Sequence, residues 1–211
     1  MGSNRDRFLH VKSMSISNSN WGDGTSNGPM SVQTAKACFK SLTTPEAVTI
    51  YCVAAITTPA SMPGTSAISI DMQQTDDTYW QVFDFAFVDG KPYDQAAFES
   101  GRPVAVVTES VARNLFGTTK AAGREFLLNH APYTVAGVVK DVSALADAAY
   151  AQVWIPYTST DLAQDTWSDN HMGMMSATIL APDRDDSMPF VKNARKSACN
   201  IIICWLKTDM S

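Results

Sequence analysis

The sequence has little of what defines several common protein classes. Its 211 residues include only four cysteines, Cys38, Cys52, Cys199 and Cys204, and none of their spacings matches C-x-x-C or another zinc or redox motif. We therefore expect buried free thiols, which leave the cellular compartment open. Positive charge is also scarce, since 16 Lys and Arg oppose 21 Asp and Glu, the net charge is -5, and no basic run exceeds two residues. This balance argues against a nucleic-acid-binding surface.

Long apolar runs are missing as well. The longest, residues 48–56 and 201–206, are shorter than the roughly 18 to 20 residues that span a bilayer. Residues 1–7 lack the apolar core of about 7 to 15 residues that a signal peptide requires. Met-Gly-Ser at the start is typical of a cloned fragment. We expect a piece cut from a longer protein, without a membrane-spanning segment of its own.

The first quarter of the chain predicts a β-α-β arrangement. Residues 8–16 alternate loosely and favour a strand, and the turn-forming residues 17–28 favour a surface loop. Ser31 is a suitable N-cap for a helix to about residue 42, and the almost wholly apolar residues 48–55 predict a strand covered on both faces. Prolines and a glycine interrupt residues 57–66, which we interpret as a domain boundary.

The next segment is dominated by aromatic residues. A short strand over residues 66–72 is followed by a polar turn, residues 73–77, in which Asp76 or Asp77 can cap a short helix. Residues 79–87 are the densest aromatic stretch of the chain. Two interpretations stay open, an aromatic platform for a ligand and ordinary packing of a small α/β layer, and packing is favoured.

The remaining pattern alternates short strands and helices. Thr108 is the expected N-cap of a helix that ends at Gly117, because Gly suits the left-handed residue after a helix. The other expected elements are a short helix over 94–100, strands over 104–107, 125–128, 133–140, 152–155 and 174–181, and a second boundary over 157–173. A helix is expected over 189–207, with a strand as the alternative for the isoleucine-rich residues 201–203.

No catalytic, metal or cofactor motif is present in the sequence. It lacks G-x-S-x-G and H-E-x-x-H, and His10, His130 and His171 lie in separate segments without an acidic or cysteine companion at ligand spacing. Residues 183–186 are acidic but lack the glycine and distant glutamate of a calcium loop. We predict no catalytic residue, no cofactor and no metal site.

Residues 70–156 nevertheless carry a specific order of residues. An aromatic pair with Val-Phe precedes a glycine turn, a strand leads into a helix that ends in Phe-Gly, and a hairpin strand is followed by a strand that ends in Ile-Pro. The positions that define this order are Phe83, Gly90, Glu109, Phe116, Gly117, Gly123, Gly137, Asp141 and Pro156. The order resembles the periplasmic core domain of MacB-like and FtsX-like ABC transporter permeases. It departs from that family at Trp80, Thr108 and Arg124, where Phe, Asn and Lys are usual.

The resemblance implies a two-lobed α+β periplasmic core domain. A βαβ-type porter-like lobe would comprise residues 1–65 and 157–211, and a smaller mixed α/β lobe, residues 66–156, would be inserted in it. In such permeases the domain lies between the first and second transmembrane helices. This position implies the periplasmic side of the bacterial inner membrane.

The resemblance also implies a role in transport without catalysis. The domain would couple ATP-driven helix motion to substrate export or to a periplasmic partner, such as an adaptor or a substrate protein. An ATP-binding subunit in the cytoplasm would supply the energy, and the parent permease would be dimeric. Two alternatives remain, a free-standing periplasmic ligand-binding or interaction module that uses the aromatic residues 79–87, and a soluble hydrolase whose site is assembled from scattered residues.

Overall fold

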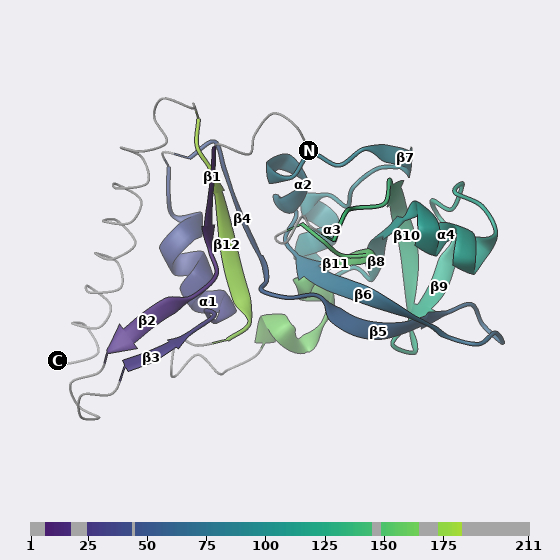
Figure 1. Cartoon of the computed structure of the whole chain (residues 1–211), viewed down its shortest axis with the longest axis horizontal. Helices are drawn as coiled ribbons and strands as arrows, with labels where there is room; N and C mark the ends of the chain where they lie inside the picture. Colours follow the sequence, from purple (N-terminus) through teal and green to yellow (C-terminus); the bar gives the residue numbers. More distant parts are fainter. Residues whose placement is uncertain (1–6, 18–24, 44, 145–148, 165–172, 183–211) are drawn as a thin grey trace. The chain divides into compact units, whose positions relative to one another are not determined.

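The computed structural model describes residues 7–17, 25–43, 45–144, 149–164 and 173–182. The chain divides into two compact units (Figure 1). Unit 1 is Met1–Val53 with Asp165–Ser211, and unit 2 is Ala54–Gln164. The sequence placed its lobe boundaries at 65/66 and 156/157, and the identification of a porter-like and an inserted lobe stays a prediction.

Unit 1 contains a three-stranded antiparallel sheet. Its central strand, β12 (Met175–Leu180), pairs with β1 (Phe8–Val11) on one side and with β4 (Ala47–Cys52) on the other. Because β12 is antiparallel to both, β1 and β4 run parallel to each other with β12 between them. The helical segment between β1 and β4 makes this a split β-α-β arrangement, as the sequence pattern suggested.

The helix of unit 1 begins where the sequence predicted. Ser31 is the N-cap, and its Oγ accepts a hydrogen bond from the Thr34 N–H at 3.1 Å. One α-helical turn, α1 (Val32–Ala35), continues as a π-helical turn, η3 (Lys36–Lys40). The helix packs against β12 and β4.

The prediction of one continuous strand over residues 8–16 is wrong. It is divided into β1 and β2 (Met14–Ser17), and β2 pairs antiparallel with β3 (Thr25–Gly28) instead of joining the main sheet. Part of the expected loop over 17–28 is therefore strand. This strand pair contains serine, threonine and asparagine, which are typical of turns. The sequence pattern therefore did not predict strands here.

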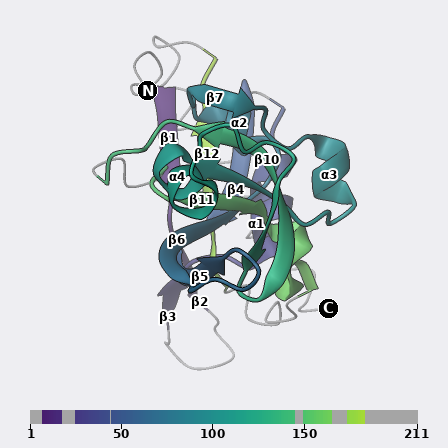
Figure 2. The same cartoon turned by 90° about the vertical axis from the view of Figure 1, so that its right-hand side faces the viewer.

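Unit 2 is built on six strands that close into a ring (Figures 1 and 2). The strands are β5 (Ile56–Ser61), β6 (Ile68–Thr75), β8 (Val104–Thr108), β9 (Glu125–Leu128), β10 (Ala131–Val139) and β11 (Val153–Pro156). Neighbours follow the order β6-β11-β8-β10-β9-β5, and β5 pairs again with β6. A seventh strand, β7 (Phe87–Gly90), pairs antiparallel with the C-terminal part of β10. The ring is a small β-barrel.

Strand β5 occupies part of residues 57–66, where the sequence pattern predicted a break in regular structure. Thr58 and Ala60 are buried and Thr57 and Pro59 are exposed, so the strand alternates despite its proline. The Pro59 carbonyl accepts from the Asn129 N–H at 2.9 Å, on the side where β9 pairs only with Ala60 and Ser61. Proline has no N–H to return this bond, and it lies where the pairing of β5 with β9 ends, a position that tolerates proline.

The interior of the barrel is filled mainly by aliphatic and small side chains. The cluster comprises Ala60, Ile70, Met72, Ala105, Val107, Val111, Ala112, Ala121, Phe126, Leu128, Tyr133, Val135, Val138, Val153 and Ile155. Two of its members, Val111 and Ala112, come from helix α4 (Glu109–Phe116), which follows β8 directly. Helix α4 therefore shares the barrel core with the strands.

The structure confirms both predicted ends of α4. Thr108 is its N-cap, and Gly117 after it has a φ of 71°. The hairpin between β9 and β10 is also confirmed, but its connection is only Asn129 and His130, both with positive φ, rather than the expected four residues. Positive φ at both positions is typical of the tight hairpin turns that match the strand twist.

Two further short helices and two 3-10 turns lie in the described part of unit 2. Unit 2 contains α2 (Tyr79–Val82), α3 (Gln95–Glu99), η4 (Tyr157–Ser159) and η5 (Asp161–Gln164), and α3 confirms the helix predicted over 94–100. The predicted helix over 189–207, His171, Cys199, Cys204 and residues 183–186 lie outside the described residues.

Candidate functional site

The glycines that define the resemblance allow three backbone segments of unit 2 to approach closely. Gly90 in β7 is the register partner of Gly137 in β10. A Cβ atom built on Gly137 would lie 2.6 Å from the Lys91 carbonyl oxygen and 2.8 Å from Cε1 of Phe87. A Cβ on Gly90 would collide with the Ala136 carbonyl oxygen and lie 2.9 Å from the Ala122 Cβ. Neither position has space for a side chain.

Residue 136 is the reason for this crowding. The register between β10 and β8 shifts between Val135 and Gly137, so Ala136 forms a bulge. Its carbonyl accepts a hydrogen bond from the Lys91 N–H at 3.2 Å. The bulge and the two glycines together fix β7 against β10, which explains two of the signature positions in physical terms.

Two other signature glycines bound a short segment, residues 117–123, which we call the strap. Gly117 and Gly123 both have left-handed φ values, 71° and 83°. Between them Ala121 is fully buried in the barrel core, and Lys120 is exposed. The strap thus inserts one methyl group into the barrel and leaves the Lys120 side chain exposed.

The carboxylate of Asp89 holds the strap. It accepts a hydrogen bond from the Ala122 N–H at 2.9 Å, and Lys120 Nζ lies 3.8 Å from its Oδ1. The backbone N–H groups of Ala122, Ala121 and Gly90, together with the Lys120 charge, lower the pKa of the Asp89 carboxyl below its ordinary value. Asp89 therefore remains ionised in neutral and mildly acidic solution.

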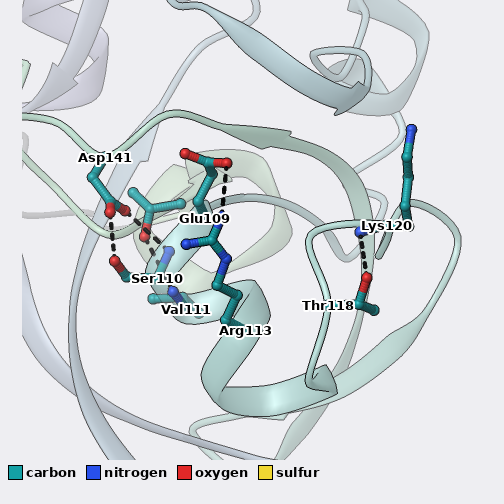
Figure 3. A network of polar contacts seen from close by, with 8 residues as sticks. Glu109, Ser110, Val111, Arg113, Thr118, Lys120 and Asp141 are labelled. Carbon is teal, nitrogen blue, oxygen red and sulfur yellow. Dashed lines mark hydrogen bonds and ion pairs between the residues drawn. The ribbon is translucent and has the colours of Figure 1, made fainter.

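A second carboxylate, Asp141, holds the start of α4 (Figure 3). Its Oδ1 accepts from the Ser110 N–H at 3.0 Å, and the Ser110 hydroxyl donates to Oδ2. Thr108 Oγ1 accepts from the Val111 N–H at 3.5 Å. Strands β8 and β10 are parallel, so their C-terminal ends lie together and place Asp141 beside the helix N-terminus, where a negative charge is favourable.

The other signature positions serve packing or helix termini. Glu109 lies in the first turn of α4 and forms an exposed ion pair of 3.4 Å with Arg113, visible in Figure 3. Phe116 is partly buried against the barrel core and meets the Phe126 ring edge-on at 6.3 Å. Phe83 is 4% exposed, and Pro156 ends β11. These roles are structural.

The predicted aromatic stretch forms a packed layer on the outer side of the barrel wall. Trp154 alternates with the inward-facing Val153 and Ile155 and so points outward. The layer, which we call the aromatic layer, consists of Tyr79, Trp80, Phe83, Phe85, Phe87, Tyr93 and Trp154, joined by ring contacts with centroid distances of 4.7 to 6.1 Å. Tyr79, Phe83, Tyr93 and Trp154 are each at most 4% exposed. The rings pack against one another, in agreement with the packing interpretation.

Buried polar residues underlie this layer and correct the turn expected over residues 73–77. Residues 73–75 belong to β6, and Gln73, Thr75 and Asp76 are at most 2% exposed. The Tyr79 hydroxyl donates to Gln73 Oε1 at 3.1 Å, and the Asp76 carboxylate accepts from the Tyr79 N–H at 3.0 Å. Thr75 and Tyr93 share a hydroxyl contact. Asp76 caps α2, as expected, but from a buried position.

Sequence reasoning missed this polar cluster. The apolar strand pattern stops at Met72, and three polar residues followed by two aspartates are typical of a turn. Burial raises the pKa of the Tyr93 and Tyr157 hydroxyls, and the negative charges of Asp76 and Asp77 add to this effect. Both phenols therefore stay protonated and act as hydrogen-bonding groups.

Within the described residues, no group of three or more His, Cys, Asp and Glu side chains lies together as a metal site would require. None of the described helices is long and apolar enough to cross a membrane. His130 is exposed in the β9–β10 turn. Cys38 and Cys52 are both buried and are not joined to each other, and burial raises the pKa of the Cys38 thiol.

Comparison with known proteins places these features in a family. The MacB-like periplasmic core domain matches residues 2–195. The macrolide export ATP-binding/permease protein MacB of Burkholderia cenocepacia (strain HI2424) is 35% identical over 85 residues, which are 39% of this chain and 12% of that protein. The uncharacterized ABC transporter permease YknZ of Bacillus subtilis (strain 168) is 21% identical over 126 residues, 60% of this chain and 30% of that protein. The chain therefore spans a small part of the curated relatives it matches.

Solved structures share the fold. The periplasmic region of MacB from Actinobacillus actinomycetemcomitans has a TM-score of 0.66 at 16% identity, covering 95% of this chain and 85% of that chain. The extracellular domain of YknZ, a noncanonic ABC-type transporter from Gram-positive bacteria, has a TM-score of 0.62 at 14% identity, covering 92% of each chain. With a family match over most of its length and the same mixed α/β fold, the chain belongs to the MacB-like periplasmic core domains of ABC transporter permeases.

Proposed function

We propose that this domain is a non-catalytic, force-transmitting part of an ABC transporter permease on the periplasmic side of the bacterial inner membrane. It passes ATP-driven motion of transmembrane helices outward, either to export a substrate or to act on a periplasmic adaptor or substrate protein. ATP is hydrolysed in a cytoplasmic subunit or domain, and the parent permease is dimeric. The observation that carries this proposal is the family match over residues 2–195.

The construction of unit 2 supports a mechanical role. Every strand of the ring pairs with a neighbour on each side, so the barrel cannot bend at a free edge without breaking ladder hydrogen bonds. Its core is densely filled, and packed interiors transmit displacement instead of absorbing it. A stiff body is what a transmission element requires.

The hydrogen bonds of three carboxylates in unit 2 support the proposal that the domain is non-catalytic. Asp76, Asp89 and Asp141 each accept a backbone N–H, from Tyr79, Ala122 and Ser110 respectively. A carboxylate that fixes a turn or a helix terminus in this way is engaged in structure. A general base needs instead a free lone pair directed at a substrate.

The test uses the full-length permease. A flexible Gly/Ser linker of about ten residues inserted after Lys207 is expected to abolish export, because a slack connection absorbs the displacement that the domain must receive. ATP binding and hydrolysis are expected to persist. Export is measured in cells or proteoliposomes, and nucleotide binding on the purified permease.

The matched control carries the same linker after Gly64. This exposed turn between β5 and β6 has open space around the glycine, so the insertion leaves the barrel intact. Export is expected to survive there. Full export with the linker after Lys207 would reject mechanical coupling through that end of the domain.

A further inference from the structure

The strap, residues 117–123, is bounded by two unobstructed hinges. A Cβ atom at Gly117 or at Gly123 would meet nothing within 4 Å, and both residues have left-handed φ values. Glycine at such positions rotates without a steric penalty. No side chain obstructs the backbone at either end of the strap, so only the backbone bonds of Gly117 to Arg113 and of Gly123 to Val135, at 2.9 and 2.8 Å, restrain these positions as hinges.

The strap is held between its hinges by a small set of contacts. The Asp89 carboxylate accepts from the Ala122 N–H, the Ala121 methyl group enters the barrel core, and Ala122 Cβ lies over Gly90. The Thr118 hydroxyl oxygen accepts from the Lys120 N–H, which is a contact inside the strap. At the second hinge the Gly123 N–H donates to the Val135 carbonyl at 2.8 Å.

The strands around the strap are held far more strongly. All five residues of β8 are buried, and β8 pairs with both β10 and β11. One methyl group buries far less apolar surface than a strand of five buried side chains, and so contributes much less burial energy. Local opening is expected where buried apolar contact is small. The ionised Asp89 carboxylate is then the main side-chain contact that holds the strap, beside the backbone bond from the Arg124 N–H to the Ala121 carbonyl at 3.0 Å.

We propose that residues 117–123 open as a unit about Gly117 and Gly123 while the barrel stays folded, and that the ionised Asp89 carboxylate keeps them closed. In the open state the Ala121 methyl group leaves the core. The strap thus controls access to this end of the barrel interior. The proposal rests on the geometry of unit 2 and is independent of the proposed function.

Amide hydrogen exchange on the 211-residue chain, followed by NMR, tests the proposal. Asp89→Asn keeps the shape of the side chain but removes its charge. It is expected to accelerate exchange of the Ala121 and Ala122 amides about tenfold or more, since a hydrogen bond to a charged acceptor is replaced by a weaker one. The amides of Val106 and Val107 in β8 are expected to keep their wild-type rates.

Asp141→Asn is the matched control. It removes a carboxylate that also accepts a backbone N–H, at the opposite end of α4. Exchange at Ala121 and Ala122 is expected to stay unchanged in this variant. Equal acceleration by both substitutions, or parallel acceleration of strap and β8 amides, would show that the strap opens only with the whole unit and would overturn the proposal.

A second measurement does not require the Asp89 variant to fold. Ala121→Cys places a thiol at a position that is fully buried in the closed strap. Its rate of modification by a maleimide, located by peptide mass spectrometry, is expected to be nearly independent of low urea concentrations, as local opening exposes little new surface. A rate that rises with urea in step with global unfolding would contradict a separate strap motion.

Discussion

The interior of the barrel and the aromatic layer outside its wall bury their side chains in different ways. Val, Ala, Ile and Leu dominate the interior cluster. The aromatic layer combines large rings with buried polar partners, among them Gln73, Thr75 and Asp76. One strand serves both regions, because Val153 and Ile155 of β11 point inward and Trp154 points outward.

This difference indicates which interactions stabilise each region. Aliphatic packing depends on volume, so its stability should respond chiefly to cavities. A layer that contains hydroxyl, amide and carboxylate groups depends also on hydrogen-bond partners, because a buried polar group without one is costly. Substitutions that change volume and substitutions that change polarity should therefore separate the two regions.

The largest effect is expected for Phe126→Ala in the interior. The Phe126 ring is 1% exposed, and its removal should lower the free energy of unfolding by about 3 to 5 kcal/mol. Phe116→Ala should cost less, about 1 to 3 kcal/mol, because that ring is only partly buried. Urea denaturation of both variants measures the difference. Equal losses would place Phe116 in the same core environment as Phe126.

A polar deletion in the aromatic layer should have the next largest effect. Tyr79→Phe removes the hydroxyl that donates to Gln73, and should cost about 1 to 3 kcal/mol because the buried amide oxygen loses this donor. Tyr133→Phe is the interior counterpart. Its hydroxyl contacts the partly exposed Ser159, which can bond elsewhere, so thermal or urea unfolding should show a smaller loss. The reverse order would contradict the comparison.

The turn that joins β9 to β10 offers a smaller, stabilising change. His130 has a φ of 66°, which costs an L-residue free energy that glycine avoids. His130→Gly should raise the free energy of unfolding by about 0.5 kcal/mol. His130→Ala keeps the Cβ atom and should give no gain. A stabilisation shared by both variants would assign the effect to the imidazole instead of the backbone.

No loss of stability is expected from a change at the Trp154 N–H. Its Nε1 is buried and has no hydrogen-bond partner in the part of the chain that the structure describes. Replacing the indole with the isosteric benzothiophene of 3-benzothienylalanine keeps the ring contacts and removes the N–H. It should raise the free energy of unfolding by about 1 kcal/mol, because a buried donor without a partner is costly. A loss above about 1 kcal/mol would show that the N–H has a stabilising partner, such as the face of the Phe85 ring.

Local signals in the sequence were sufficient to predict much of the secondary structure of unit 2. Helix α4 was predicted from Thr108 and Gly117 because an N-cap and a left-handed terminal glycine are properties of a few neighbouring residues. The strands β8 and β11 of unit 2, and β12 of unit 1, were predicted from apolar runs bounded by turn residues. The resemblance supplied the signature glycines, but not their function in the packing.

Features that depend on distant partners could not be predicted. Gln73 is a strand residue because β6 pairs with β11, about 80 positions further along the chain, and its polar side chain finds Tyr79. The bond between Asp89 and the strap joins residues 33 positions apart, and no periodic pattern encodes it. Pairing over such distances is a property of the folded topology, which composition and spacing do not specify.

The position of β11 in the ring has a consequence for biogenesis. This strand lies between β6 and β8 although it follows both in the sequence, and it is the last of the six strands to be synthesised. A nascent chain that has not yet reached residue 153 therefore exposes two unpaired strand edges, which are sites for aggregation. We expect this domain to depend on rapid completion of its synthesis or on chaperones until β11 pairs with β6 and β8 and closes the barrel.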